Sequence, residues 1–95
     1  MAELIEASEL GEATADLTDW QVDDALVRTH QFPTFPDAVA AVAEVAAIAE
    51  GMDHHPDIDI RWRTVTFRCV THSAGGITDL DVRLAAAIDA VIEGS

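Results

Sequence analysis

Hydrophobic residues recur at helical spacing in the middle of the chain and predict a long helix from Pro36 to Gly51. Proline in the first turn and glycine just past the last turn are common boundaries of a helix. Between them, alanines surround larger apolar residues that are three positions apart: Val39, Val42, Val45 and Ile48.

This expected helix is apolar nearly all round, because Glu44 is the only charged residue between Asp37 and Glu50. A helix of that kind must be covered on more than one side. The core of so small a domain can cover one face, so we expect a second subunit to cover the other.

After residue 56 the pattern changes to alternation of apolar and polar positions, which predicts strands. Ile58 and Ile60 set the first phase, and the second phase is set by Val65, Phe67 and Cys69. Because the phase shifts by one position, we expect a tight turn or a bulge between Trp62 and Thr64.

The N-terminal part of the chain is less clearly patterned. We expect residues 1–7 to be disordered and a weak helix to run from Ser8, as N-cap, to about Leu17. A turn after Trp20 then leads to a short strand from Leu26 to Phe32, which prolines bound on its C-terminal side.

The last element is predicted to be a helix that begins at Thr78 and ends at Gly94. Thr78 and Asp81 have the three-residue spacing of a capping box. The expected core-facing stripe of this helix consists of Leu80, Leu84, Ile88 and Val91 or Ile92. The order helix, strand, helix, strands, helix indicates a single α+β domain over residues 1–95, with helices covering one face of an antiparallel sheet.

Charge excludes some classes of partner. The 95 residues include 18 acidic and 5 basic side chains, a formal net charge of −13, which repels phosphate backbones and anionic lipid surfaces. No run approaches the roughly 18 apolar residues of a membrane span. We therefore expect neither nucleic acid nor a membrane as a partner, and we interpret the acidic surface as a contribution to solubility.

Cysteine usage and the N-terminal residues favour a cytoplasmic protein. Cys69 is the only cysteine, so an internal disulfide is impossible. The N-terminal residues lack the basic start and the continuous apolar run that a secretory signal requires. Cys69 alternates with core positions and has no base beside it in the sequence, so we interpret it as a core thiol.

Three histidines lie where regular structure is expected to stop: His54 and His55 precede Pro56, and His72 follows a strand. Imidazole gives and takes protons near neutral pH, so converging histidines suit general acid–base chemistry. Asp81 could hold one imidazole in its useful tautomer, besides capping the last helix. Spacing alone equally allows each histidine to be a loop residue with a local hydrogen bond.

The motifs together resemble the signature of the pterin-4a-carbinolamine dehydratases, the 4a-hydroxytetrahydrobiopterin dehydratase family. The resemblance spans about residues 20–92 and rests on motifs in the family's order and spacing. These are Ala49-Glu50, Asp53-His54-His55-Pro56, Trp62 with Val65, Thr71-His72, Gly75-Gly76-Ile77-Thr78 and Asp81. The sequence departs from the family's usual residues at His30, Val39, Trp62 and Leu80. These departures concern details of the pocket and leave the expected catalytic histidines in place.

The resemblance implies a four-stranded antiparallel sheet with three helices packed on one face. It also implies a homodimer or homotetramer assembled through the sheet edge and the helix at residues 36–50. The implied reaction is dehydration of 4a-hydroxytetrahydropterin to quinonoid dihydropterin, with no cofactor and no metal.

The resemblance also implies the roles of the site residues. His54 and His72 would be general acid and base, His55 would orient the substrate, and Asp81 would assist catalysis. The implied substrate-binding residues are Trp20, Glu50, Asp53, Pro56, Thr71 and Ser73. The simpler interpretations are that Trp20 packs against the sheet and that Glu50 faces solvent.

Two other functions compete with this reading. His54, His55, His72 and Glu50 could supply ligands for zinc, although the sequence has no helical ligand pair at i and i+4. Relatives of the family also act as dimerisation partners of other proteins, so a non-catalytic, protein-binding role is the second alternative.

Overall fold

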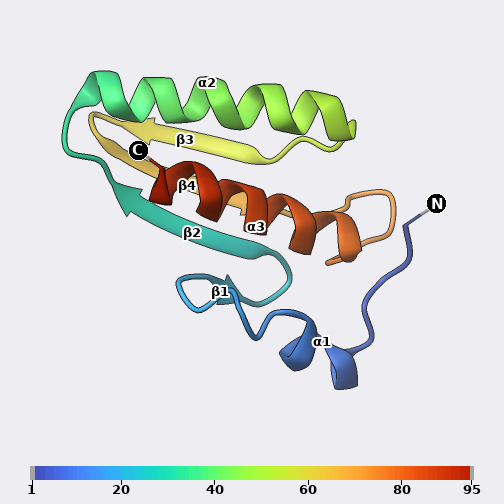
Figure 1. Cartoon of the computed structure of the whole chain (residues 1–95). Helices are drawn as coiled ribbons and strands as arrows, with labels where there is room; N and C mark the ends of the chain where they lie inside the picture. Colours follow the sequence, from blue (N-terminus) through green and yellow to red (C-terminus); the bar gives the residue numbers. More distant parts are fainter. Residues whose placement is uncertain (1, 95) are drawn as a thin grey trace.

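A computed structural model describes residues 2–94 and confirms the expected α+β fold. Its elements are α1 (Ala7–Ala13), β1 (Gln21–Val22), β2 (Leu26–Gln31), α2 (Phe35–Met52), β3 (Asp57–Arg61), β4 (Thr64–Cys69) and α3 (Asp79–Glu93). The strands form one antiparallel sheet in the order β1-β2-β4-β3. Figure 1 shows α2 and α3 side by side over the sheet.

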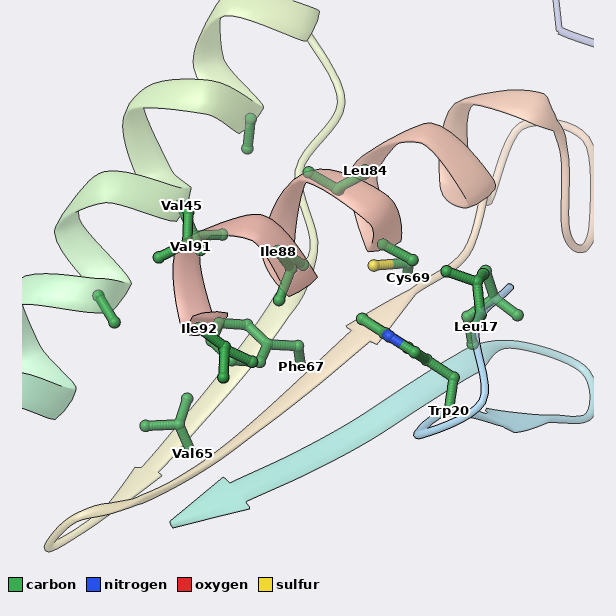
Figure 2. Packing of buried hydrophobic residues seen from close by; sticks show 14 of the residues in the cluster. Leu17, Trp20, Val45, Val65, Phe67, Cys69, Leu84, Ile88, Val91 and Ile92 are labelled. Carbon is green, nitrogen blue, oxygen red and sulfur yellow. The ribbon is translucent and has the colours of Figure 1, made fainter. Parts of the chain in front are cut away.

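The hydrophobic core lies between the sheet and these two helices (Figure 2). Strand β4 alternates between buried and half-buried residues, so one side of the strand faces the core. Its three buried residues, Val65, Phe67 and Cys69, pack with α3 residues that include Leu84, Ile88 and Ile92. The helix α2 contributes Val45 and several alanines, whose small size lets the two helices approach closely.

The shift in the alternation of apolar and polar residues between β3 and β4 corresponds to a two-residue turn. Arg61 pairs with Thr64 across the hairpin, and Ile58 lies opposite Phe67. The apolar residues of both strands therefore share one face of the sheet, and the expected tight turn is confirmed. Trp62 in the turn has a left-handed backbone (φ 55°).

The long helix is slightly longer than the sequence indicated, because Gly51 lies inside it and does not end it. Asp53 adopts the left-handed conformation instead, with φ 51° and ψ 42°, which aspartate tolerates better than most residues. The next backbone N–H, that of His54, donates to the carbonyl of Ala49 at 3.0 Å. This six-residue closure is a Schellman motif.

The first helix is shorter than predicted and begins earlier. Glu6 and not Ser8 is the N-cap. The helix ends before Thr14, whose hydroxyl donates to the carbonyl of Leu10 at 2.8 Å. Residues 14–16 form turns, and Leu17 reaches the core just after them.

The segment before α1, for which the sequence suggested disorder, runs beside the start of α3. Leu4 pairs with Thr78 in an isolated bridge, and the N–H of Ile5 donates to the carbonyl of Ile77 at 2.9 Å. Met1 and Ser95, which the single-domain interpretation included, lie outside the described residues.

Helix α3 has the predicted caps, Thr78 and Gly94. Its buried stripe differs from the expected one: Leu80 was expected to face the core but is half-buried, whereas Asp81 and Ala85 are fully buried. In the described part of the chain, no helix is both long and apolar enough to cross a membrane.

Candidate active site

The end of α2 places His54 against the start of α3. The Nε2 atom of His54 lies 2.6 Å from Oδ1 of Asp81. The His54 side chain is 10% exposed and that of Asp81 is 0% exposed, so water does not screen this pair strongly. The Schellman motif positions the histidine, because it turns the chain sharply just before residue 54.

The second oxygen of Asp81 is held by two threonines. Oδ2 accepts the backbone N–H of Thr78 at 2.9 Å and the hydroxyl of Thr71 at 2.7 Å. The contact with Thr78 is one half of the predicted capping box. Asp81 therefore both caps α3 and binds His54, two roles that the sequence left open.

The partners of Asp81 determine the tautomer of His54. A carboxylate only accepts hydrogen bonds, so Nε2 of His54 carries a proton and Nδ1 has the free lone pair of the neutral ring. Nδ1 makes no hydrogen bond to the described residues. Because no buried side-chain nitrogen or oxygen of these residues lacks a partner, Nδ1 must be reachable by solvent.

His72 lies in the turn between β4 and α3. The backbone N–H of Thr71 donates to the carbonyl of Gly76 at 2.9 Å, and Gly75 takes a left-handed φ of 80° that glycine adopts easily. The side chains of His72 and Ser73 are exposed. Since Thr71 contacts Asp81 directly, the network brings the residue preceding His72 to the partner of His54.

The remaining residues of the double-histidine motif are more open to solvent. Nε2 of His55 lies 2.8 Å from Oε1 of Glu50, and both side chains are exposed. Asp53 is exposed and closes α2, whereas Pro56 is half-buried. The structure therefore groups His54, His55 and Glu50 at one end of α2.

Trp20 is buried and binds a residue that the sequence did not single out. Its indole N–H donates to Oδ1 of Asp89 at 2.7 Å, and Arg28 binds the same oxygen. A buried tryptophan usually needs an acceptor for its N–H. Asp89 lies four positions after the buried Ala85 and therefore on the same side of α3. An acidic residue on the core-facing side of a helix was the signal in the sequence that could have identified Asp89.

Two pKa shifts follow from burial. Burial, with a smaller contribution from the Asp81 and Asp57 charges, raises the pKa of Cys69 to about 12, which keeps the thiol protonated and agrees with a core role. Burial, with the nearby Arg28 charge, lowers the pKa of His30. The ring of His30 meets that of Phe32 edge-on at 4.7 Å, away from the proposed acid–base residues in the sequence.

Among the described residues, neither a metal cluster nor the hollow beside α1 coincides with the histidines. Within residues 2–94, no group of three or more His, Cys, Asp or Glu side chains is placed to hold a metal ion. An open hollow lies between the N-terminal segment, α1 and the start of α3, where Leu4, Glu9 and Leu80 are among its lining residues.

Comparison with known proteins matches a family model for pterin 4 alpha carbinolamine dehydratase over residues 3–91. Two relatives are provisionally named pterin-4-alpha-carbinolamine dehydratases. The protein from Mycolicibacterium vanbaalenii is 57% identical over 84% of this chain and 87% of its own. The protein from Roseiflexus castenholzii is 50% identical over 97% of this chain and 100% of its own.

Two solved structures share the fold. The crystal structure of a transcriptional coactivator/pterin dehydratase from Brucella melitensis superimposes with a TM-score of 0.87 at 33% identity, covering 92% of this chain and 96% of that one. A pterin dehydratase-like RuBisCO assembly factor of the alpha-carboxysome matches with a TM-score of 0.62 at 22% identity, covering 76% and 84% of the two chains. The second likeness shows the fold alone.

Proposed function

The chain belongs to the pterin 4 alpha carbinolamine dehydratase family, and from this premise we propose that it dehydrates 4a-hydroxytetrahydropterin to quinonoid dihydropterin. The observation that carries the proposal is the buried pair of His54 and Asp81. This pair leaves one imidazole nitrogen free for proton transfer in a place where the family signature expects it.

The reaction needs two proton movements and no change of oxidation state. The C4a–O bond breaks as the 4a-hydroxyl takes a proton and leaves as water, and the ring N5 loses a proton as the N5=C4a bond forms. Histidines that both give and take protons suit these two steps. A positioned acid or base typically contributes about 100- to 10,000-fold in rate.

We assign the two proton movements to His54 and His72, with Nδ1 as the reacting nitrogen of His54. Asp81 supports the proposal because its carboxylate stabilises the imidazolium form that appears when Nδ1 takes a proton. His55, held by Glu50, would orient the pterin ring. Asp53, Pro56 and Ser73 flank these histidines in the sequence and would complete the substrate site.

Thr71 and Trp20 are less suited to direct contact with substrate, because both are buried and their polar atoms are bound within the protein. Their contribution to the site would therefore be made through Asp81 and Asp89. The proposed chemistry needs no redox cofactor, since elimination of water transfers no electrons to an acceptor.

We also propose that the protein is a cytoplasmic homodimer or homotetramer that associates through α2 and the sheet edge. Phe35 and Val39 of α2 are 48% and 43% exposed, and their i, i+4 spacing places both large apolar side chains on the same face of the helix, where a second copy could cover them. Strand β3 is an outermost strand of the sheet. Sedimentation of the wild type as a monomer at micromolar concentration would contradict this assembly.

A second candidate is a protein-binding role without catalysis. The same exposed residues of α2 favour it, and the Brucella melitensis relative is described as both a transcriptional coactivator and a pterin dehydratase. In this alternative a different protein, and not a second copy, would cover α2.

The test that separates the two functions is the rate of 4a-hydroxytetrahydropterin dehydration. The substrate would be generated in situ and followed by absorbance, with and without the wild-type protein and with and without a chelator. Acceleration that the chelator does not reduce supports the dehydratase. If the wild type gives no acceleration, the proposal fails and the protein-binding role becomes the better account.

A further inference from the structure

We propose that Thr71 is a positioning residue that acts on His54 through Asp81. This inference deepens the proposed dehydratase function and rests on it for its kinetic consequence. The three residues come from different elements: His54 follows α2, Thr71 follows β4, and Asp81 lies in the first turn of α3. Asp81 joins them, with one oxygen 2.6 Å from His54 Nε2 and the other 2.7 Å from the Thr71 hydroxyl.

The distances set the direction of each hydrogen bond in this network. The hydroxyl oxygens of Thr71 and Thr78 are 2.7 Å apart, whereas that of Thr78 is 3.5 Å from Asp81. Thr71 has one hydroxyl proton, and Asp81 can only accept, so Thr71 donates to Asp81. The Thr78 hydroxyl then donates to Thr71, and the backbone N–H of Thr78 donates to Asp81 at 2.9 Å.

The network restricts how Asp81 can rotate. The donors on Oδ2 come from the turn before α3 and from the N-cap of that helix, both of which are backbone-anchored. With Oδ2 bound on that side, Oδ1 is directed at Nε2 of His54. Without the Thr71 donor, Asp81 would keep only the Thr78 contacts on this oxygen and would be freer to turn away from the imidazole.

The same residue links the two proposed proton-transfer groups. Thr71 precedes His72, and its backbone N–H is bound to Gly76. Its hydroxyl therefore ties the turn that carries His72 to the carboxylate that binds His54. A displacement of about 1 Å at a reacting group can cost about 100-fold in rate, so this hydrogen bond can affect the reaction even though Thr71 is buried.

The test compares Thr71→Val, which removes the donor at nearly constant size, with Thr71→Ser, which keeps the hydroxyl. Thr71→Ala is the second donor-free variant in case the valine disturbs folding. Thr66→Val is the matched control, because Thr66 shares a hydroxyl contact of 2.9 Å with Thr29 across β2 and β4, away from Asp81. Circular dichroism and thermal melting check that each variant is folded.

Two readouts are measured for each variant: kcat and KM for dehydration, and the nitrogen-15 NMR shifts of the His54 ring. We expect Thr71→Val and Thr71→Ala to lower kcat by about 10- to 100-fold with KM changed less than about twofold. Their His54 ring should shift from the Nε2–H tautomer toward a mixture of tautomers. Thr71→Ser and Thr66→Val should retain the wild-type kcat and tautomer.

The NMR readout separates failure of this inference from failure of the proposed function. If the wild type has no dehydratase activity, a change of tautomer in Thr71→Val still supports the positioning role. Folded Thr71→Val and Thr71→Ala proteins that keep a pure Nε2–H tautomer would overturn the inference, whatever the activity. Equal loss of kcat in Thr71→Ser and Thr71→Val would also overturn it, because the hydroxyl would then not be the group that matters.

Discussion

His54 and Asp81 are 27 positions apart in the sequence and form a hydrogen bond of 2.6 Å between largely buried side chains. The contact joins the end of α2 to the first turn of α3, the two helices that pack side by side over the sheet (Figure 1). It leaves Nδ1 of the imidazole as the nitrogen that can exchange a proton with a bound molecule.

Replacing Asp81 by asparagine should lower kcat for dehydration by about 100-fold or more, because the neutral amide stabilises the imidazolium less well. The free energy of unfolding should fall by about 1–3 kcal/mol, because the amide cannot satisfy all the buried donors. Steady-state kinetics and urea denaturation measure the two effects.

Asp79→Asn is the matched control for that substitution, since Asp79 lies in the same first turn but is exposed. Its kcat and its urea midpoint should stay close to those of the wild type. Similar losses in both variants would show that the charge at the helix N-terminus, and not the contact with His54, causes the effect.

Cys69 should make the protein less stable at alkaline pH. Its pKa in the folded state is about 12, above the reference value of 9.0. The stability that comes from burying the neutral thiol is therefore fully present below pH 9 and is lost as pH rises toward 12. In that interval the unfolded state binds fewer protons than the folded state, and stability should fall by up to about 1.4 kcal/mol per pH unit.

The sequence makes this effect measurable without interference. All 5 basic residues are arginines and there is no tyrosine, so Cys69 is the side chain whose proton binding differs between the unfolded and folded states from pH 9 to 11. Urea midpoints under reducing conditions should decline over this range in the wild type and stay level in Cys69→Ala. An equal decline in both proteins would refute the assignment.

Two valines of α2 should differ in their contribution to the stability of the isolated chain. Val45 is fully buried between the helices and the sheet (Figure 2), whereas Val39 is exposed. Val45→Ala should lower the free energy of unfolding by about 2 kcal/mol through lost burial and the cavity left behind.

In an isolated chain, Val39→Ala should change stability by no more than about 0.5 kcal/mol. Urea denaturation over a range of protein concentrations measures both variants. A large, concentration-dependent loss in Val39→Ala would mean that Val39 is buried in an assembly, which is the outcome that the proposed oligomer through α2 requires.

The sequence predicted the elements that have a strong repeating pattern. The valine spacing identified α2, and the alternation of Ile58, Ile60, Val65 and Phe67 identified β3, β4 and the turn between them. The strand β1 was missed because two residues cannot show an alternation. The end of α2 was misplaced because Asp53 took the left-handed conformation that glycine usually supplies.

The candidate site was predictable only as a set of residues. Motifs identified His54, His72 and Asp81, but the contact between His54 and Asp81 depends on how α2 and α3 pack. The donation from Thr71 to Asp81 and the acceptance of the Trp20 N–H by Asp89 are likewise long-range contacts. No spacing rule within one element could have revealed them.

The most direct test of the proposed mechanism is the rate of 4a-hydroxytetrahydropterin dehydration by the wild type and by His54→Ala, measured at equal concentrations of folded protein. If Nδ1 of His54 moves a proton in the reaction, the variant should lose about 100- to 10,000-fold in kcat. A His54→Ala protein that dehydrates the pterin as fast as the wild type would contradict the central role given to His54 and its carboxylate partner.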